Sequence, residues 1–478
     1  MKRAVLTGAN DPNAHAQLIS DLLARNKLSA AETASRKAVK KFPDHVPLHL
    51  LRAQILGQSG KFQPARHLLQ KLVTRTPDIA PAYTLLGIID SEQGLDDDAI
   101  ANFETALRLA PNDCQASYFA ASLYLKAMAD DKAERALKRT LEISPDHVDA
   151  LKNLGELMVK TNRYEDAVGY LRRAMSLTRI DDQSAVCLIL AETIGNDLAT
   201  GLEAARHLYA MHPESIGVRE AYVFALIRCG ELEAAIRLCD EIIAEARNPT
   251  TAIAYKASAL AESGHEERAS ELLAMDRFVA EEVLPLPDGW DSIETFNEAL
   301  VSEICNHETL ADHAANRSLK NASDTLELFT GDETGAIKGL REAIHASVET
   351  YIPAIAEEEG HPFPEAVPSD FRLEAWANVY PRSGRQLSHF HPEAWLSGVY
   401  YPKMPANLPV NDAGAQEGAL ELGRSYYRLK MSNDVATREI LPAPGTLVMF
   451  PAFTGHCTVP ITSTDETRIS VAFNIVPA

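Results

Sequence analysis

The sequence has little positive charge, few cysteines and no long apolar run. Lysine and arginine number 46 against 67 aspartates and glutamates, which gives a net charge of −21. A protein that binds nucleic acid needs a basic surface for phosphate contacts. The charge balance therefore argues against a nucleic-acid partner and against an anionic membrane surface. A basic peptide or protein partner is compatible with it.

The missing apolar runs exclude further classes. No segment approaches the roughly 18 consecutive apolar residues of a transmembrane helix. The start, MKRAVLTGANDPNAH, lacks the apolar stretch of a signal peptide. The six cysteines are scattered without C-x-x-C spacing, so we expect reduced thiols in a cytoplasmic protein rather than disulfides or a zinc site.

Proline recurs at a fixed interval in the first half of the chain. The interval is 34 residues, and the prolines concerned are Pro43, Pro77, Pro111 and Pro145. This period resembles the tetratricopeptide repeat, a pair of helices that stacks on its neighbours. In the clearest copy, residues 80–113, Gly87 and Ala99 are small where two helices must cross closely, and Phe103 fills the gap to the next unit.

The resemblance implies an all-α solenoid of about seven repeats over residues 1–275. Its curvature gives a concave groove that suits an extended peptide or a partner helix. We therefore expect a peptide or protein partner. The competing interpretation is an array that only self-associates or holds the second domain in place.

The pattern changes after the repeats. Residues 276–290 contain prolines and a glycine and are predicted to be a linker, or else a strand leading into the next domain. Residues 291–358 read as helical. From residue 370 on, short β-branched and aromatic runs alternate with turn residues, which is typical of a barrel or jelly roll. The predicted fold is multidomain, with the solenoid followed at residues 291–478 by an α+β domain that has a double-stranded β-helix (jelly-roll) core.

Three histidines and an arginine in this second domain suggest a metal site. His389 and His391 would share one face of a predicted strand, Leu387–His391. His456 follows in a loop, and Arg468 opens the last strand. Neutral imidazoles are ligands for iron, zinc, nickel and copper. A guanidinium beside the metal can hold a carboxylate at two points.

Ser470 stands two residues after Arg468 and would therefore lie on the same face of the strand. Its hydroxyl can donate to the same carboxylate. The competing interpretation pairs Arg468 with Asp465 or Glu466 at the protein surface.

The segments HFHPEAWLSGVYYP, FPAFTGHCTVP and RISVAFNI resemble the 2-oxoglutarate and Fe(II)-dependent oxygenase family, over roughly residues 285–478. The resemblance implies Fe(II) as the metal and 2-oxoglutarate as the cosubstrate. It also implies iron ligands at His389 and His456. The distal carboxylate of 2-oxoglutarate would be bound by Arg468, Ser470 and a tyrosine of the pair Tyr400 and Tyr401.

The third iron ligand is open between two candidates. The family's usual set is two histidines and one carboxylate, but His391 stands where the aspartate of His-x-Asp would be. Either His389, His391 and His456 form a three-histidine site, or His391 and Glu393 of His-Pro-Glu are the ligands. In the second case His389 would not touch the metal and would only support a ligand. Pro392 between two ligands disfavours regular strand geometry, which favours three histidines.

The sequence thus predicts an Fe(II)- and 2-oxoglutarate-dependent dioxygenase that hydroxylates a peptide or protein side chain presented by the repeats. The pairing of domains is a weak basis for the substrate class, so a small-molecule hydroxylase is the runner-up. A repeat adaptor whose barrel has lost turnover and a three-histidine dioxygenase without a cosubstrate are also compatible with the pattern. The three-histidine dioxygenase gives no role to Arg468.

Overall fold

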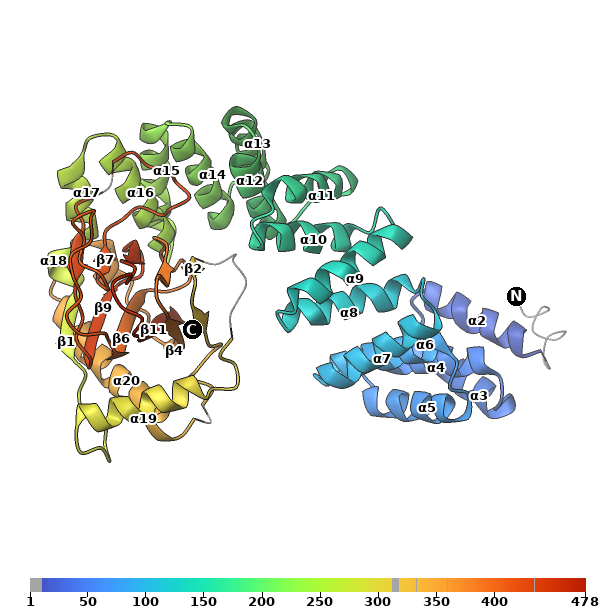
Figure 1. Ribbon diagram of the computed structural model, residues 1–478. Helices are drawn as coiled ribbons and strands as arrows, with labels where there is room; N and C mark the ends of the chain where they lie inside the picture. Colours follow the sequence, from blue (N-terminus) through green and yellow to red (C-terminus); the bar gives the residue numbers. More distant parts are fainter. Residues whose placement is uncertain (1–10, 312–317, 332, 359, 434) are drawn as a thin grey trace. The chain divides into compact units, whose positions relative to one another are not determined.

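The computed structural model describes residues 11–478 except 312–317, 332, 359 and 434. Residues 1–10, where the repeat array was predicted to begin and where a signal peptide was not expected, lie outside this part. The chain divides into two compact units (Figure 1). One comprises Met1–Met158 and Asp166–Ile180, and the other comprises Val159–Glu165 and Asp181–Ala478.

The first unit is built from pairs of consecutive helices, and its last pair, α10 and α11, includes residues assigned to the second unit. Their bounds are α2 (Pro12–Ala24), α3 (Leu28–Lys41), α4 (Val46–Gln58), α5 (Phe62–Arg75), α6 (Ala80–Glu92), α7 (Asp96–Leu109), α8 (Cys114–Lys126), α9 (Asp130–Ile143), α10 (Val148–Lys160) and α11 (Tyr164–Leu177). The pairs continue in the second unit with α12 (Asp182–Gly195), α13 (Leu198–Met211), α14 (Ile216–Arg228), α15 (Leu232–Glu245), α16 (Thr250–Glu262) and α17 (Glu266–Leu273). The described chain therefore holds eight helix pairs where about seven repeats were expected.

The regular prolines mark where the second helix of a pair ends. Helices α3, α5, α7 and α9 each end two residues before one of them. Proline has no amide hydrogen to donate and its ring disfavours helical geometry at the residue before it. The 34-residue proline spacing therefore follows the spacing of these helix ends.

Small residues stand where the two helices of a pair cross. A Cβ atom added at Gly87 would lie 2.6 Å from the ring of Phe103, which is fully buried. At the equivalent place in a later pair, a Cβ atom on Gly155 would lie 2.5 Å from Leu171. The predicted close crossing at Gly87 is confirmed.

We expect Gly87→Ala to lower the stability of the repeats, because the added methyl group must displace Phe103 and overpacking costs about 1–3 kcal/mol. Gly169→Ala is the matched control. It lies in helix α11 with no heavy atom within 4 Å of its added Cβ, so its better helix propensity should stabilise by up to about 1 kcal/mol. Thermal unfolding of the full chain, followed by circular dichroism, should give opposite shifts. A gain in stability with Gly87→Ala would contradict the close crossing.

The second unit continues with α18 (Met275–Phe278), β1 (Ala280–Val283), α19 (Ile293–Cys305), β2 (Leu319–Lys320), β3 (Ser323–Asp324), α20 (Gly335–Ile355) and α21 (Pro362–Glu365). Strand β1 pairs with β9, so the segment predicted to be a linker contributes an edge strand to the main sheet. The helical prediction for residues 291–358 holds for α19 and α20. Short strands stand between them.

The remaining strands are β4 (Phe371–Tyr380), β5 (Arg385–Gln386), β6 (Leu396–Lys403), β7 (Leu420–Leu422), β8 (Arg438–Ile440), β9 (Thr446–Pro451), β10 (His456–Thr458) and β11 (Arg468–Pro477). They form a six-stranded sheet in the order β1-β9-β6-β11-β4-β3, a three-stranded sheet β10-β7-β8 and a two-stranded sheet β2-β5. All pairings are antiparallel. A β-rich domain after the helical repeats is confirmed, and the jelly-roll core stays a prediction.

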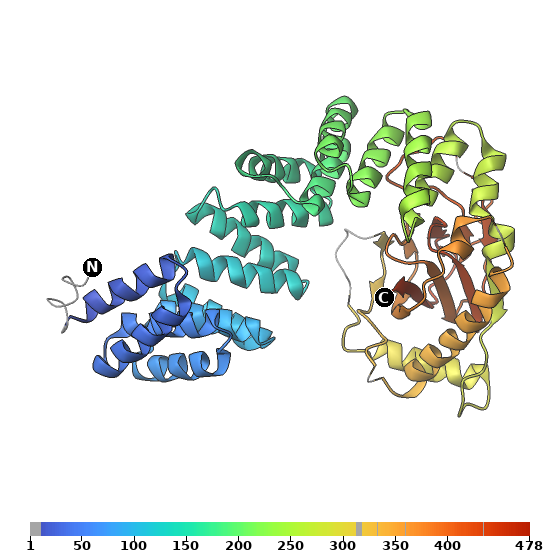
Figure 2. The same ribbon diagram turned by 180° about the vertical axis from the view of Figure 1, so that it is seen from behind.

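One hydrophobic core runs through the second unit. It includes residues of α14–α17, of α19 and α20, and of the main-sheet strands β4, β6, β9 and β11. Figure 2 shows the helices α14–α17 beside the strands, seen from behind. The last helix pairs and the β-rich domain therefore share one core. In the described part of the chain, no helix has the length and apolar character that crossing a bilayer requires.

Candidate metal centre

His389, His391 and His456 converge on one point. The ring centroids are 4.2 Å apart for His389 and His456, 5.0 Å for His389 and His391, and 5.1 Å for His391 and His456. Each ring offers one nitrogen, and these three atoms all lie within 4.8 Å of one another. Such a separation suits three ligands of a single metal ion.

The backbone around the first two histidines is not the regular strand that was predicted. Strand β5 ends at Gln386. His389 makes an isolated pair of hydrogen bonds with His456, at 3.0 and 2.9 Å, while the amide of His391 donates to the carbonyl of Ala452 at 3.2 Å. Because successive amides bond to different segments, no ladder forms. The two side chains still reach the same site.

Backbone carbonyls fix the tautomers of two histidines. Nδ1 of His389 lies 2.8 Å from the carbonyl oxygen of Leu387, and Nδ1 of His456 lies 3.0 Å from that of Thr454. Each Nδ1 therefore carries the hydrogen, and each Nε2 keeps its lone pair for a metal. Nε2 of His389 is buried and has no hydrogen-bond partner among the described residues.

The third histidine is held through an amide. Nδ1 of His391 lies 3.3 Å from the carboxamide of Asn474, which also contacts the hydroxyl of Ser397 at 2.8 Å. A carboxamide can present its oxygen or its nitrogen at nearly the same place. It can therefore support the tautomer that leaves Nε2 of His391 available to a metal.

Burial keeps all three rings neutral. It lowers the pKa of His389 to about 4 and the pKa values of His391 and His456 well below their ordinary range. Neighbouring histidines lower the last two further. Neutral imidazole is the form that coordinates a metal, so the residues present fit a metal ion.

These low pKa values predict that the metal-free protein loses stability in acid. The unfolded His389 takes up a proton near pH 6.5 and the folded one only near pH 4. The unfolded state therefore binds more protons between these values, and stability falls as the pH drops from about 6.5 to 4, by about 3 kcal/mol for this residue. Urea unfolding at several pH values should show a shallower decline for His389→Gln. An equal decline in both proteins would contradict the neutral buried ring.

Arg468 is a buried cation beside the histidines. Its side chain is 2% exposed, and its guanidinium carbon lies 5.0 Å from the ring centre of Tyr380 and 5.2 Å from that of Tyr401. Nη1 donates to the carbonyl of Gly418 at 3.3 Å, and Nε is buried without a partner. Within the described ranges, no carboxylate forms an ion pair with it.

An unpaired buried charge is costly, so this guanidinium fits a carboxylate ligand supplied from outside. The competing surface pairing is wrong, because Asp465 lies 3.2 Å from Arg382 instead and Arg468 is inside the domain.

Ser470 and Tyr401 lie in the same cavity as Arg468. All three line a narrow cavity together with the three histidines, and the hydroxyl of Tyr401 is buried without a partner in the described structure. Burial raises the pKa of Tyr401 to about 12, although the charge of Arg468 opposes this shift. The neutral phenol can therefore donate a hydrogen bond to a carboxylate bound there.

The prediction for Tyr400 needs correction. Neighbouring residues on a strand face opposite sides of a sheet. Tyr400 accordingly points away from Arg468, and its hydroxyl donates to the side-chain oxygen of Asn297 in α19. It anchors α19 to the sheet and does not reach the site.

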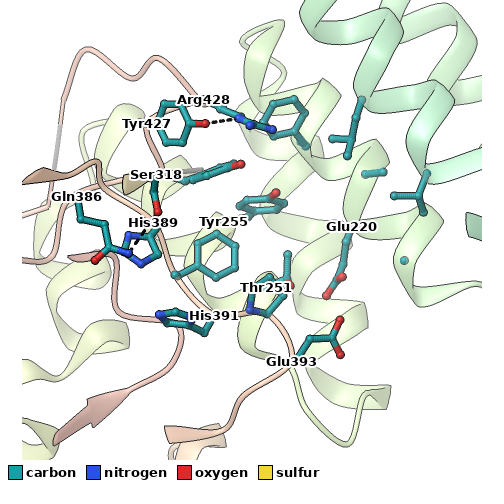
Figure 3. Close-up of a pocket in the computed structure, with 18 of the residues that line it drawn as sticks. Glu220, Thr251, Tyr255, Ser318, Gln386, His389, His391, Glu393, Tyr427 and Arg428 are labelled. Atoms are coloured by element: carbon teal, nitrogen blue, oxygen red, sulfur yellow. Dashed lines mark hydrogen bonds between the residues drawn. The ribbon is translucent and has the colours of Figure 1, made fainter. Parts of the chain in front are cut away.

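Glu393, the second candidate for the third ligand, lies apart from the three histidines. It is exposed and is not among the residues whose ligand atoms come together. Figure 3 shows its carboxylate on the side of Glu220, away from the ring of His391. The geometry therefore favours a centre of three histidines.

A larger cavity, of about 650 Å³, opens onto His389 and His391. Its other wall is formed by the repeat helices α12, α14 and α16. Glu220 comes from α14, and Thr251 and Tyr255 come from α16 (Figure 3). No sequence signal pointed to these residues, because a repeat pattern specifies how helices pack and not which surface they turn to another domain.

Comparison with known proteins agrees with the two halves of the structure. Residues 374–474 match a family model described as "Putative 2OG-Fe(II) oxygenase". Residues 17–82, 50–113 and 131–179 match models of the tetratricopeptide repeat. A segment that matches this oxygenase family thus follows segments that match the tetratricopeptide repeat. The matched oxygenase segment contains all three histidines and Arg468.

Other similarities are confined to part of the chain. The human protein O-mannosyl-transferase TMTC1 is 27% identical over 139 residues, which is 28% of this chain and 16% of that protein. The mouse protein of the same name is 28% identical over 28% of this chain and 15% of its own length. The chain thus spans about a sixth of these curated relatives.

Two solved structures are also similar. The structure of Pseudomonas aeruginosa pilF has 18% identity and a TM-score of 0.40, over 44% of this chain and 95% of that one. A tetratricopeptide repeat protein from Parabacteroides merdae has 16% identity and a TM-score of 0.33, over 54% and 90% of the two chains.

Proposed function

We propose that the chain is an Fe(II)- and 2-oxoglutarate-dependent dioxygenase that hydroxylates a side chain of a peptide or protein. The observation that carries this proposal is Arg468, a buried guanidinium without a carboxylate partner in the described chain, in one cavity with three neutral histidines. A metal site that uses no keto acid gives this arginine no role.

Separate groups of residues would bind the metal ion and 2-oxoglutarate. His389, His391 and His456 would hold Fe(II), and Arg468 with Ser470 and Tyr401 would bind the distal carboxylate of 2-oxoglutarate. Bound Fe(II) and 2-oxoglutarate supply the oxidation, in which R–H, 2-oxoglutarate and O2 become R–OH, succinate and CO2. The protein orients both ligands and keeps the buried site dry.

The repeats suggest a polypeptide as substrate, because tetratricopeptide arrays bind extended peptides and helices. A second candidate, a small-molecule hydroxylase, is favoured by one observation. The cavity of about 650 Å³ has the size of an ordinary small-molecule pocket.

The experiment that tests the proposal is a turnover assay with the full chain. Protein loaded with Fe(II) is supplied with 2-oxoglutarate and oxygen, and succinate is measured with and without peptides. We expect slow succinate formation that needs all three components and rises when a substrate peptide is present. Metal binding without any succinate, under all these conditions, would indicate an adaptor that has lost turnover.

A further inference from the structure

The large cavity has an acidic end. Glu220 of α14 and Glu393 of the loop after His391 both line it, and Figure 3 shows their carboxylates on the same side of the cavity, near Thr251 of α16. One comes from a repeat helix and the other from the oxygenase domain. They meet because both parts belong to one compact unit.

Hydrogen bonds from the start of α16 and the residues before it hold the loop that carries Glu393. The side-chain amide of Asn248 donates to the carbonyls of Pro392 and Ala394 at 3.3 and 3.2 Å, and the hydroxyl of Thr250 donates to Ala394 at 2.9 Å. The loop is therefore fixed against the repeat helices, and the position of Glu393 opposite Glu220 is built into the fold.

The two carboxylates have no positive partner. Neither forms an ion pair in the described part of the chain. The pKa of Glu220 is raised to about 7, chiefly by burial and further by the charge of Glu393, while the hydroxyl of Thr251 acts in the opposite direction. A cation between the two carboxylates would stabilise the charged form of Glu220, which its burial and the charge of Glu393 disfavour.

Arg428, the arginine that lines the same cavity, does not pair with either carboxylate. Arg428 donates to the hydroxyl of Tyr427 at 2.7 Å and also to the side chain of Asn162. Its guanidinium lies 5.4 Å from the ring centre of Tyr164. Figure 3 shows it beside Tyr427, at the opposite end from Glu220 and Glu393.

The space between the acidic end and the histidines suits a hydrocarbon chain. Phe390 packs edge-on against Tyr255 and against Tyr426, with ring centroids 5.8 and 5.7 Å apart, and all three rings line the cavity. His389, 9% exposed and with an unpartnered Nε2 among the described residues, lines the same cavity. The cavity thus joins an acidic end and an aromatic wall to the proposed metal centre.

We propose that this cavity binds a substrate group with a positively charged nitrogen, held by Glu220 and Glu393, so that its carbon chain faces the three histidines. The inference rests on the proposed function and names its substrate class. A lysine or arginine side chain of a polypeptide has this chemistry, and so does a free amine. Repeat helix α14 would then determine specificity through Glu220.

The test uses the full chain loaded with Fe(II) and 2-oxoglutarate. Peptide pools with one fixed central residue and mixed flanks, and separately free lysine, arginine and spermidine, are compared by the succinate that each adds. We expect the lysine or arginine pools, or one of the free amines, to stimulate most. Glu220→Gln should reduce that stimulation by at least about tenfold, as a lost charged contact of about 1.5–3 kcal/mol implies.

Glu233→Gln is the matched control, because it removes the same charge from an exposed position on α15. It should keep the full preference for cationic substrates. Each sample is also checked for the visible band that Fe(II) and 2-oxoglutarate give together. A normal band with no preference for cationic pools or amines would overturn this inference and leave the proposed function standing. A preference that survives in Glu220→Gln would do the same, whereas absence of the band in the unmodified protein would contradict the proposed function itself.

Discussion

His391→Ala is expected to abolish tight Fe(II) binding, whereas Glu393→Ala should leave it intact. The ring centre of His391 lies 5.0 and 5.1 Å from those of His389 and His456, whereas the carboxylate of Glu393 is turned away. Even losing a group that only supports a metal ligand costs about 10–100-fold in affinity, so losing a ligand should cost more than about 100-fold.

Anaerobic titration with Fe(II), followed by calorimetry, measures this difference directly. His345→Ala is a suitable control, because this histidine is exposed on α20 and far along the chain from the cluster. The opposite pattern, with Fe(II) lost in Glu393→Ala and kept in His391→Ala, would show that the carboxylate is the third ligand.

Arg468→Ala should weaken 2-oxoglutarate binding by roughly 30-fold to 5,000-fold, since removing one partner of a buried charge pair costs about 2–5 kcal/mol. Fe(II) binding should stay unchanged, because the guanidinium is held by Tyr380, Tyr401 and the carbonyl of Gly418 and not by the histidines. The affinity of Arg468→Lys for 2-oxoglutarate should lie between that of the unmodified protein and that of Arg468→Ala. An ammonium group keeps the charge but cannot hold a carboxylate at two points.

Binding of 2-oxoglutarate to the Fe(II) form, measured without oxygen, gives these affinities. Arg382→Ala serves as the control, because this arginine pairs with Asp465 at the surface. Unchanged affinity in Arg468→Ala would favour a dioxygenase that uses no cosubstrate. Loss of both ligands together would indicate that the arginine is needed for folding of the site.

The sequence allowed the repeats and the clustering of the three histidines with Arg468 to be predicted, because both follow short sequence patterns. The proline period marked the helix ends, and Gly87 marked a close crossing that the structure confirms. The order of His389, His391, His456 and Arg468 indicated one site, and the structure brings these four residues to one cavity.

Long-range pairing was not predictable in the same way. The strand expected at residues 387–391 does not form, because its amides bond to separate segments. The choice between Tyr400 and Tyr401 depended on which face of β6 meets the histidines, and alternation alone cannot say which. Glu220 belongs to no recognisable sequence motif. It lines the cavity because α14 shares a hydrophobic core with the β-rich domain.

The most direct test of the proposed dioxygenase function is the visible spectrum of the purified chain. It is recorded without oxygen after adding Fe(II), 2-oxoglutarate, or both. We predict a weak band that appears only when both are present and that is absent from His391→Ala and strongly reduced in Arg468→Ala. A spectrum that does not respond to 2-oxoglutarate, from protein that has demonstrably bound Fe(II), would contradict the assignment of Arg468 and the dioxygenase proposal with it.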